Sequence, residues 1–439
     1  MNNTKTTKRA LLSSVMAMLL CVAMLIGTTF AWFTDYASTA VNKIQAGTLK
    51  IQLLDESGNS LEGETLSWQK AAGHESEAVL WEPGCTYNLK SFKIKNNGNL
   101  ALKYKIIISG IVGDNELLNA IDFTVSGVTG AETATALNGF EGHLTANSET
   151  ALITITGKMK KDAGNKYQGK SIDGIGITVV ATQDTVEADS VDGQYDVDAE
   201  YDTAAVTATE LAALMTPDSN GVINLEKNYI VTDAWTSLTF GVSPVVINGN
   251  GYTISGLNKP LLAGNAASDI TINELTINAS SIGIAANENG LGTAAFVSYM
   301  DANTSATFKK CRLVNSSVTG NERAAALVSF TSCSTLTIED CSVENCEIKA
   351  VGGTGGLVGY SQNAATIKNS SVKNTSITST EDRKGTKTPV AGGVIGTVCG
   401  ATTFTNVTAT EVTVSNNNAT DHENYLIGRI TGAGSITIN

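Results

Sequence analysis

The chain has 439 residues and a net charge of −13, with no basic cluster, which argues against nucleic acid and anionic lipid surfaces as partners. Glycine is abundant (42 residues) and proline scarce (5), and threonine, serine, asparagine and valine are frequent. This composition predicts an all-β protein of many short strands, long enough for two or three domains.

The N-terminus has the pattern of an export signal. Three basic residues precede an apolar run over 10–26, which is short for a membrane span. Small residues at Thr29 and Ala31 satisfy the usual cleavage rule, so residues 1–31 are predicted to be a signal peptide cleaved after Ala31. A retained N-terminal anchor is the alternative.

Residues 32–183 are predicted to be the first domain, and from about residue 44 they alternate apolar and polar side chains. The clearest runs are 49–53, 92–95, 102–106 and 152–156, and a turn-forming Asn-Asn-Gly-Asn stands at 96–99. Alternation with one wet face predicts an antiparallel β-sandwich.

This region also resembles a known family. The segments on which the resemblance rests are GTTFAWFTDYAS (27–38), NKIQAGTLKIQLLD (42–55), WEPGCTYNLKSFKIKNNGNLALKYKIIISG (81–110), LTANSETALITITGKM (144–159) and NKYQGKSIDGIGITVVATQ (165–183). In this order they resemble the TasA/camelysin family of Gram-positive exported proteins, processed by a SipW-type signal peptidase. The resemblance implies a secreted, surface-associated protein of the extracellular or biofilm matrix.

The resemblance further implies that the mature N-terminal segment adds a strand to the next subunit. That segment would contain Trp32, Phe33, Asp35 and Tyr36. Its partner would be a second copy or a related matrix subunit, held by main-chain hydrogen bonds. The alternative is that the segment packs against its own sandwich.

Residues 184–205 are predicted to be an acidic linker. Between positions 183 and 203 the chain carries eight acidic residues and no basic one, which favours an extended, solvated segment. No cofactor is expected, although a weak candidate Ca²⁺ site is formed by Asp189, Asp192, Asp196 and Asp198. Their spacing does not match a helix-flanked calcium loop.

Residues 206–439 repeat themselves after a short predicted helix over 208–215. The motif AAFVSY at 294 recurs as AALVSF at 325, GGLVGY at 355, GGVIG at 392 and NYLIG at 424. The motif thus returns every 30 to 37 residues, and further predicted strands recur in phase with it. This pattern predicts a right-handed parallel β-helix of roughly 30-residue rungs. Turn positions are assigned to Asn369, Asn374 and Asn406, where asparagine tolerates the left-handed conformation and can form ladders.

Two resemblances concern this region. Residues 244–257 resemble the opening rung of pectate-lyase-like β-helices, and the Gly-Gly-Leu-Val-Gly repeats resemble the GLUG motif of bacterial surface proteins. Both imply a fold rather than an activity.

The cysteines leave two interpretations open. Cys85 stands alone in the first domain, and Cys311 and Cys341 occupy equivalent positions of adjacent rungs. Export permits disulfides, yet small buried thiols in a stacked core explain the pattern as well. The second domain's five cysteines are Cys311, Cys333, Cys341, Cys346 and Cys399.

The sequence predicts that the protein is not an enzyme. The acidic residues of the repeats are scattered along the chain: Asp301, Glu339, Asp340, Glu344 and Glu347. A glycosidase of this fold needs carboxylates close together. His74, His143 and His422 form no zinc-binding motif.

The expected function is therefore that of an exported structural or adhesive protein. It would assemble through its N-terminal strand and make contacts through the β-helix, with a cell-surface glycan as a further candidate partner. The alternatives are a polysaccharide-binding adhesin that does not polymerise, and a β-helix carbohydrate-active enzyme.

Overall fold

The protein is described here by a computed structural model. It describes residues 34–38, 49–61, 66–75, 77, 79–113, 115–128, 135–137, 140–170, 172–184, 199–264, 269–283, 292–302, 304–380, 390–416, 426–431 and 434–438. These residues are mostly β-strand, with one α-helix among them, α2 (Ala208–Leu214). The coarse prediction of a β protein is confirmed. No helix of the described residues is long and apolar enough to cross a membrane.

The N-terminal part, here called the antiparallel module, contains three antiparallel sheets. Their orders are β1-β11-β6-β9, β3-β4-β10-β7-β8 and β2-β5. The strands are β1 (Thr34–Ser38), β2 (Ile51–Leu54), β3 (Trp68–Gln69), β4 (Thr86–Leu89), β5 (Lys93–Asn96), β6 (Leu102–Gly113), β7 (Ile121–Ser126), β8 (Thr135–Ala136), β9 (Gly142–Leu144), β10 (Thr154–Met159) and β11 (Ile172–Gln183), with 3₁₀ turns η2 (Asn115–Ala120) and η3 (Asn165–Tyr167).

Alternation positions the core of this module. In β6, Leu102, Tyr104 and Ile106 are buried, while Lys103 and Lys105 lie on the other face. The antiparallel pairing agrees with the prediction. A two-layer sandwich of the TasA type remains a prediction.

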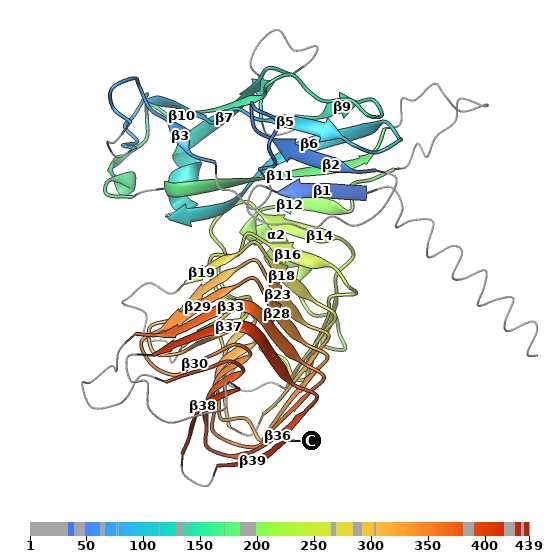
Figure 1. Ribbon diagram of the computed structural model, residues 1–439, viewed down its shortest axis with the longest axis vertical. Helices are drawn as coiled ribbons and strands as arrows, with labels where there is room; N and C mark the ends of the chain where they lie inside the picture. Colours follow the sequence, from blue (N-terminus) through green and yellow to red (C-terminus); the bar gives the residue numbers. More distant parts are fainter. Residues whose placement is uncertain are drawn as a thin grey trace, which may run out of the picture.

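The C-terminal part, here called the stacked module, is built from parallel sheets (Figure 1). An eleven-stranded sheet contains β12 (Thr203–Val206), β14 (Asn228–Val231), β16 (Thr253–Ser255), β18 (Thr276–Asn278), β19 (Ser281–Gly283), β23 (Arg312–Val314), β24 (Ser317–Thr319), β28 (Ser342–Glu344), β29 (Glu347–Ala350), β33 (Ser371–Ser379) and β37 (Thr408–Asn416). An eight-stranded sheet contains β13 (Val222–Asn224), β15 (Val245–Asn248), β17 (Ile270–Asn273), β22 (Ser305–Lys309), β27 (Thr335–Glu339), β32 (Ala365–Lys368), β36 (Ala401–Thr405) and β39 (Ser435–Ile438).

Two smaller parallel sheets complete the stack. One contains β21 (Val297–Met300), β26 (Val328–Thr331), β31 (Val358–Ser361), β35 (Ile395–Val398) and β38 (Ile427–Ile430). The other contains β20 (Thr293–Ala294), β25 (Ala324–Ala325), β30 (Thr354–Gly355) and β34 (Ala391–Gly392). The sequence repeat sets the register, since Ala294 pairs with Ala325 and Gly355 with Gly392. The sheets are compatible with the predicted β-helix.

Left-handed residues turn the chain at the corners of each rung. Asn369, Asn374 and Asn406 have φ values of 49°, 45° and 51°, which confirms the predicted turn positions. Their amides also form ladders: Asn406 donates to Asn369 at 3.2 Å, and Asn374 donates to Asn345 at 2.7 Å. Asparagine is favoured here because it tolerates this backbone conformation and its amide pairs with the next rung.

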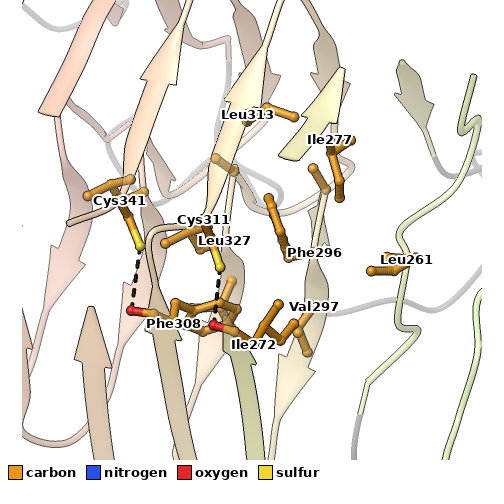
Figure 2. Packing of buried hydrophobic residues seen from close by; sticks show 14 of the residues in the cluster. Leu261, Ile272, Ile277, Phe296, Val297, Phe308, Cys311, Leu313, Leu327 and Cys341 are labelled. Atoms are coloured by element: carbon orange, nitrogen blue, oxygen red, sulfur yellow. Dashed lines mark hydrogen bonds between the residues drawn. The ribbon is translucent and has the colours of Figure 1, made fainter. Parts of the chain in front are cut away.

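Three cysteines, Cys311, Cys341 and Cys346, occupy buried positions that directly follow such corners. Cys311 donates its thiol hydrogen to the carbonyl of Ile272 at 3.2 Å, and Cys341 donates to Phe308 at 3.5 Å (Figure 2). All six cysteines of the described residues are free thiols. Cys311, Cys333, Cys341 and Cys346 act as small buried side chains, and Cys85 and Cys399 are half-buried.

The junction of the two modules differs from the predicted linker at its C-terminal end. Residues 203–205 belong to β12, which pairs with β14 as the first strand of the stack. Tyr201 packs against the cluster of Ile107, Val180 and Ile230, which joins both modules. At the other end, Asp184 is buried, and its Oδ2 lies 2.8 Å from His143 Nδ1. The two ends of the predicted linker thus pack against the modules, while residues 185–198 lie outside the described residues.

Candidate functional site

A cavity of about 1180 Å³ lies between the two modules. Its apolar wall comes from the antiparallel module and includes Ile107, Leu118, Phe123, Phe140 and Val180. Its charged and phenolic groups are Lys103, Lys105, Asp122, Glu141, Glu200, Tyr201, Glu210, Lys227 and Asp233. Cavities at module junctions with an apolar wall and a few convergent polar groups are the usual form of a ligand site.

The lysines reach the cavity because of the pleat of β6. Tyr104 and Ile106 point into the core, so Lys103 and Lys105 project from the opposite face toward the stacked module. Ile107 continues this outer row and makes the apolar contact to Ile230.

Tyr201 links the two walls. Its hydroxyl donates to Glu141 Oε2 at 2.9 Å, and its ring centroid lies 4.5 Å from Lys105 Nζ. Lys105 also lies 3.9 Å from Glu141 Oε2. Burial, together with the Glu141 carboxylate, raises the pKa of the Tyr201 phenol, so it remains a hydrogen-bond donor across the physiological range.

The stacked module supplies carboxylates that also cap α2. Asp233 Oδ1 accepts from the backbone N–H of Ala208 at 2.5 Å, and Glu210 Oε2 accepts from that of Thr207 at 2.7 Å. Thr207 and Glu210 form a reciprocal capping box. Lys227 pairs with Glu200 at the rim. Two acid–base pairs thus line the cavity, Lys105–Glu141 and Lys227–Glu200, while Glu210 and Asp233 accept from backbone N–H groups.

The predicted assembly residues are placed in part. Asp35 and Tyr36 belong to β1, where they pair with Ala181 and Val180 of β11 in the same chain. Ala31, Trp32 and Phe33 lie outside the described residues.

The predicted calcium candidates Asp189, Asp192, Asp196 and Asp198 also lie outside the described residues. Within the described part of the chain, no three histidine, cysteine or acidic side chains are grouped to hold a metal ion. His74 pairs with Glu77 at 2.8 Å in an exposed turn.

Four of the five acidic residues predicted from the repeats contact bases, amides or hydroxyls. Glu339 lies 3.9 Å from Lys309 and 3.3 Å from Lys368. The others are Asp340, which accepts from Asn369 at 3.1 Å; Glu344, 3.8 Å from Arg312; and Asp301, which accepts from Tyr299 at 2.5 Å. Glu347 is exposed at the start of β29.

The cavity was not predicted from the sequence. Tyr201 stands inside the acidic run and reads there as part of a solvated linker, although an aromatic residue in such a run is a signal of docking. For Lys103 and Lys105 of β6, the sequence predicts only the solvent-facing side of a strand.

The comparisons with known proteins found solved structures only. No family model and no curated protein matches the chain. Seven solved chains match. One is the Agl-KA catalytic domain, with 9% identity over 91% of this chain and 100% of that chain, at a TM-score of 0.20. Another is the catalytic unit of a GH87 α-1,3-glucanase from Streptomyces thermodiastaticus strain HF3-3, with 11% identity over 92% and 96%, at a TM-score of 0.18.

These matches contradict the expectation that the protein is not an enzyme. That expectation rested on scattered carboxylates, whereas the matched chains are catalytic domains, including a GH87 α-1,3-glucanase bound to nigerose. This third match has 12% identity over 90% of this chain and 100% of that chain, at a TM-score of 0.18. At such values the matches transfer neither a substrate nor a catalytic residue to this chain.

Proposed function

We propose that this chain is an exported, carbohydrate-directed protein that holds a polysaccharide segment in the cavity between its modules. The observation that carries the proposal is the cavity itself, whose apolar wall faces charged side chains that include two acid–base pairs, Lys105–Glu141 and Lys227–Glu200. Residues 1–31 would direct export from a Gram-positive cell, with cleavage after Ala31 by a SipW-type peptidase.

The physical argument is the match between the cavity and a sugar. A pyranose presents apolar C–H faces and a rim of hydroxyls that both donate and accept. Phe123 and Phe140 offer apolar surface, while Lys103 and Asp233 offer a donor and an acceptor. The volume exceeds that of typical small-ligand pockets, so several sugar units fit.

The test is a binding and turnover screen of the mature chain, residues 32–439. Pull-down on insoluble glucans, including α-1,3-glucan, measures binding, and release of reducing ends measures hydrolysis. We expect retention on at least one polysaccharide, weakened by Phe140→Ser and kept in Leu214→Ser, an exposed control on α2. Absence of both binding and release across the panel overturns the proposal.

The second candidate function is assembly through β1. One observation favours it: β1 is an edge strand, held on β11 by main-chain pairing over Thr34–Ser38. A strand held in this way can pair with β11 of another copy instead. The proposed location, at the cell surface or in the matrix, agrees with such assembly.

Electron microscopy tests this candidate. The mature chain should form filaments or join preformed ones, and deletion of residues 32–43 should abolish this. Monomers under all conditions, with no effect of the deletion, would exclude assembly through β1.

A further inference from the structure

The end of the stacked module that lies away from the antiparallel module is an open sheet edge (Figure 1). Three strands, β37, β38 and β39, form its last rung. Each pairs with only one other described strand: β33, β35 and β36, respectively. Unpaired strand edges of this kind are templates for pairing with another chain. These three strands are called the terminal rung.

The terminal rung has the side chains of an interior rung. One inward position of the eight-stranded sheet recurs in register through all of its strands, where it is occupied by Ile223, Ile247, Ile272, Phe308, Ile338, Ile367, Phe404 and Ile438. All but the last of these residues are at most 2% exposed, whereas Ile438 is 57% exposed. An aliphatic side chain thus stands at a core position that no described rung covers.

The neighbouring sheet shows the same difference. Val372 and Ile377 of β33 are completely buried, while Ala409 and Val414, their partners on β37, are only half-buried. Stacked repeats normally end in a cap with a polar outer face, and exposed strand edges normally carry a charge or a proline. The β39 sequence, Ser-Ile-Thr-Ile, has neither. The terminal rung is therefore built to be covered.

The opposite end of the stack is closed. Helix α2 and its C-cap place Leu211 and Met215, both completely buried, in the core cluster of the stack, and the antiparallel module lies beyond them (Figure 1). Head-to-tail stacking of one copy on another is therefore blocked. The body that offers three strand edges in a matching arrangement is the terminal rung of a second copy.

The charges of the terminal rung also fit a second copy. The chain has a net charge of −13, so two copies repel each other over most of their surface. Within β37, β38 and β39 the charged residues are Glu411 and Arg429, one of each sign. Two terminal rungs can therefore approach each other without net repulsion.

We propose that two copies of this chain associate end to end through their terminal rungs, related by a two-fold axis. The axis makes β39 antiparallel to β39 of the second copy, and opposite residues of an antiparallel pair lie on the same face. One register sets every isoleucine of the two strands opposite another isoleucine: Ile436 faces Ile438 of the second copy, and Thr437 faces Thr437. The two aliphatic cores then form one. The contact is closed, so it builds a dimer and no filament.

Oxidative cross-linking of the mature chain tests this register. In Thr437→Cys the two new thiols lie opposite each other across the axis, with Cα atoms about 4.5–5.5 Å apart, which suits a disulfide. Thr403→Cys is the matched control, because Thr403 pairs with Thr437 one rung earlier. Its thiols lie three strand spacings, roughly 14 Å, apart and cannot bridge. We expect a covalent dimer on a non-reducing gel from Thr437→Cys alone.

Sedimentation velocity over a range of concentrations tests the association itself. The wild type should pass from monomer to dimer and no further. Ile438→Lys should weaken the dimer about a hundredfold or more, because each dimer loses the burial of two isoleucines and gains two buried charges. Leu214→Lys, at an exposed position of α2 near the closed end, is the control and should dimerise normally. Both positions are exposed in a single copy, so both variants should fold.

Deletion of residues 32–43 separates this contact from assembly through β1, and it should leave the dimer unchanged. If the deletion abolishes the dimer, the contact runs through β1 and the proposal fails. A monomer at every concentration, or a dimer that Ile438→Lys does not weaken, also overturns it and leaves the terminal rung to another partner. Equal cross-linking of Thr437→Cys and Thr403→Cys would indicate random collision and would refute the register.

Discussion

At the scale of single residues, the stack depends on left-handed corners that carry amide ladders. Asn345 has a φ of 56°, accepts from Asn374 and donates to Asn315 at 3.1 Å. Asn345 therefore contributes in two ways: it tolerates a positive φ, and its amide forms a hydrogen bond to each neighbouring rung. Substitutions can separate these two contributions.

Asn345→Ala should lower the unfolding free energy of the stacked module by about 1–2 kcal/mol. Alanine is disfavoured at a positive φ, and it cannot form the amide hydrogen bonds to the neighbouring rungs. Asn345→Gly should lower the unfolding free energy less, because glycine adopts a positive φ readily and only the amide hydrogen bonds are lost. Urea denaturation of the mature chain measures both. Equal losses in the two variants would show that the backbone conformation does not matter at this corner.

The buried thiols give a prediction on pH and reactivity. Burial raises the pKa of Cys346 to about 12, and burial raises that of Cys311 well above its usual value. Below about pH 8.5 both states keep these protons, and above it only the unfolded chain loses them. Stability should therefore fall as pH rises from about 9 toward 12.

Alkylation at pH 8 checks the same point. In the native state only the half-buried Cys85 and Cys399 should react with iodoacetamide, and all six thiols should react after unfolding. Native modification of Cys311 or Cys346, found by peptide mass spectrometry, would contradict the burial described here.

At the scale of elements, the repeated glycines let the rungs approach closely. A Cβ on Gly359 would lie 2.3 Å from the carbonyl oxygen of Ser329, and one on Gly396 would lie 2.5 Å from that of Gly359. At Gly359 in β31, and at Gly396 in β35, there is therefore no room for a side chain.

Gly359→Ala should lower the unfolding free energy by about 1–3 kcal/mol, the usual cost of overpacking. Gly283→Ala is the matched control, because nothing lies within 4 Å of its Cβ and its φ needs no glycine. Thermal unfolding followed by circular dichroism compares the two. A larger loss in the control would refute the argument.

The elements also show what a single sequence can predict. Period-2 alternation predicted β2, β5, β6 and β10, and the repeat of AAFVSY-like motifs predicted the pairing of Val328 with Val297 and with Val358. Both signals are local or periodic. The cavity depends on how distant elements pack against one another, and so does the edge-to-face pair of Trp68 and Trp81, whose ring centroids are 5.0 Å apart. No local sequence pattern encodes such packing. Gly157 in β10 leaves room for these two rings, since its Cβ would lie 2.9 and 3.0 Å from them, while the sequence shows only a glycine in a strand.

At the scale of the whole molecule, the antiparallel module lies at one end of the stacked module (Figure 1). At their junction Tyr201 packs against Ile107, Val180 and Ile230. The phenol contacts Glu141 and Lys105 of the antiparallel module, while the residues that follow it enter β12. These three residues also line the cavity proposed to bind the ligand. Contact between the modules and binding of the ligand should therefore be linked.

Tyr201→Ala should loosen the junction, because it removes the ring over Lys105 and the hydrogen bond to Glu141. Small-angle scattering of the mature chain should show a larger radius of gyration, with unchanged strand content by circular dichroism. Tyr201→Phe keeps the ring and should have a smaller effect. A variant with the wild-type scattering profile would show that other contacts hold the modules together.

We propose that the cavity between the modules binds carbohydrate. Calorimetric titration tests this, with soluble fragments of whichever polysaccharide retains the mature chain, in the wild type and in Phe140→Ser. We expect a saturable heat with one site in the wild type, and an affinity about tenfold or more weaker in the variant. Equal affinity in both proteins, or no heat with any fragment, would contradict it.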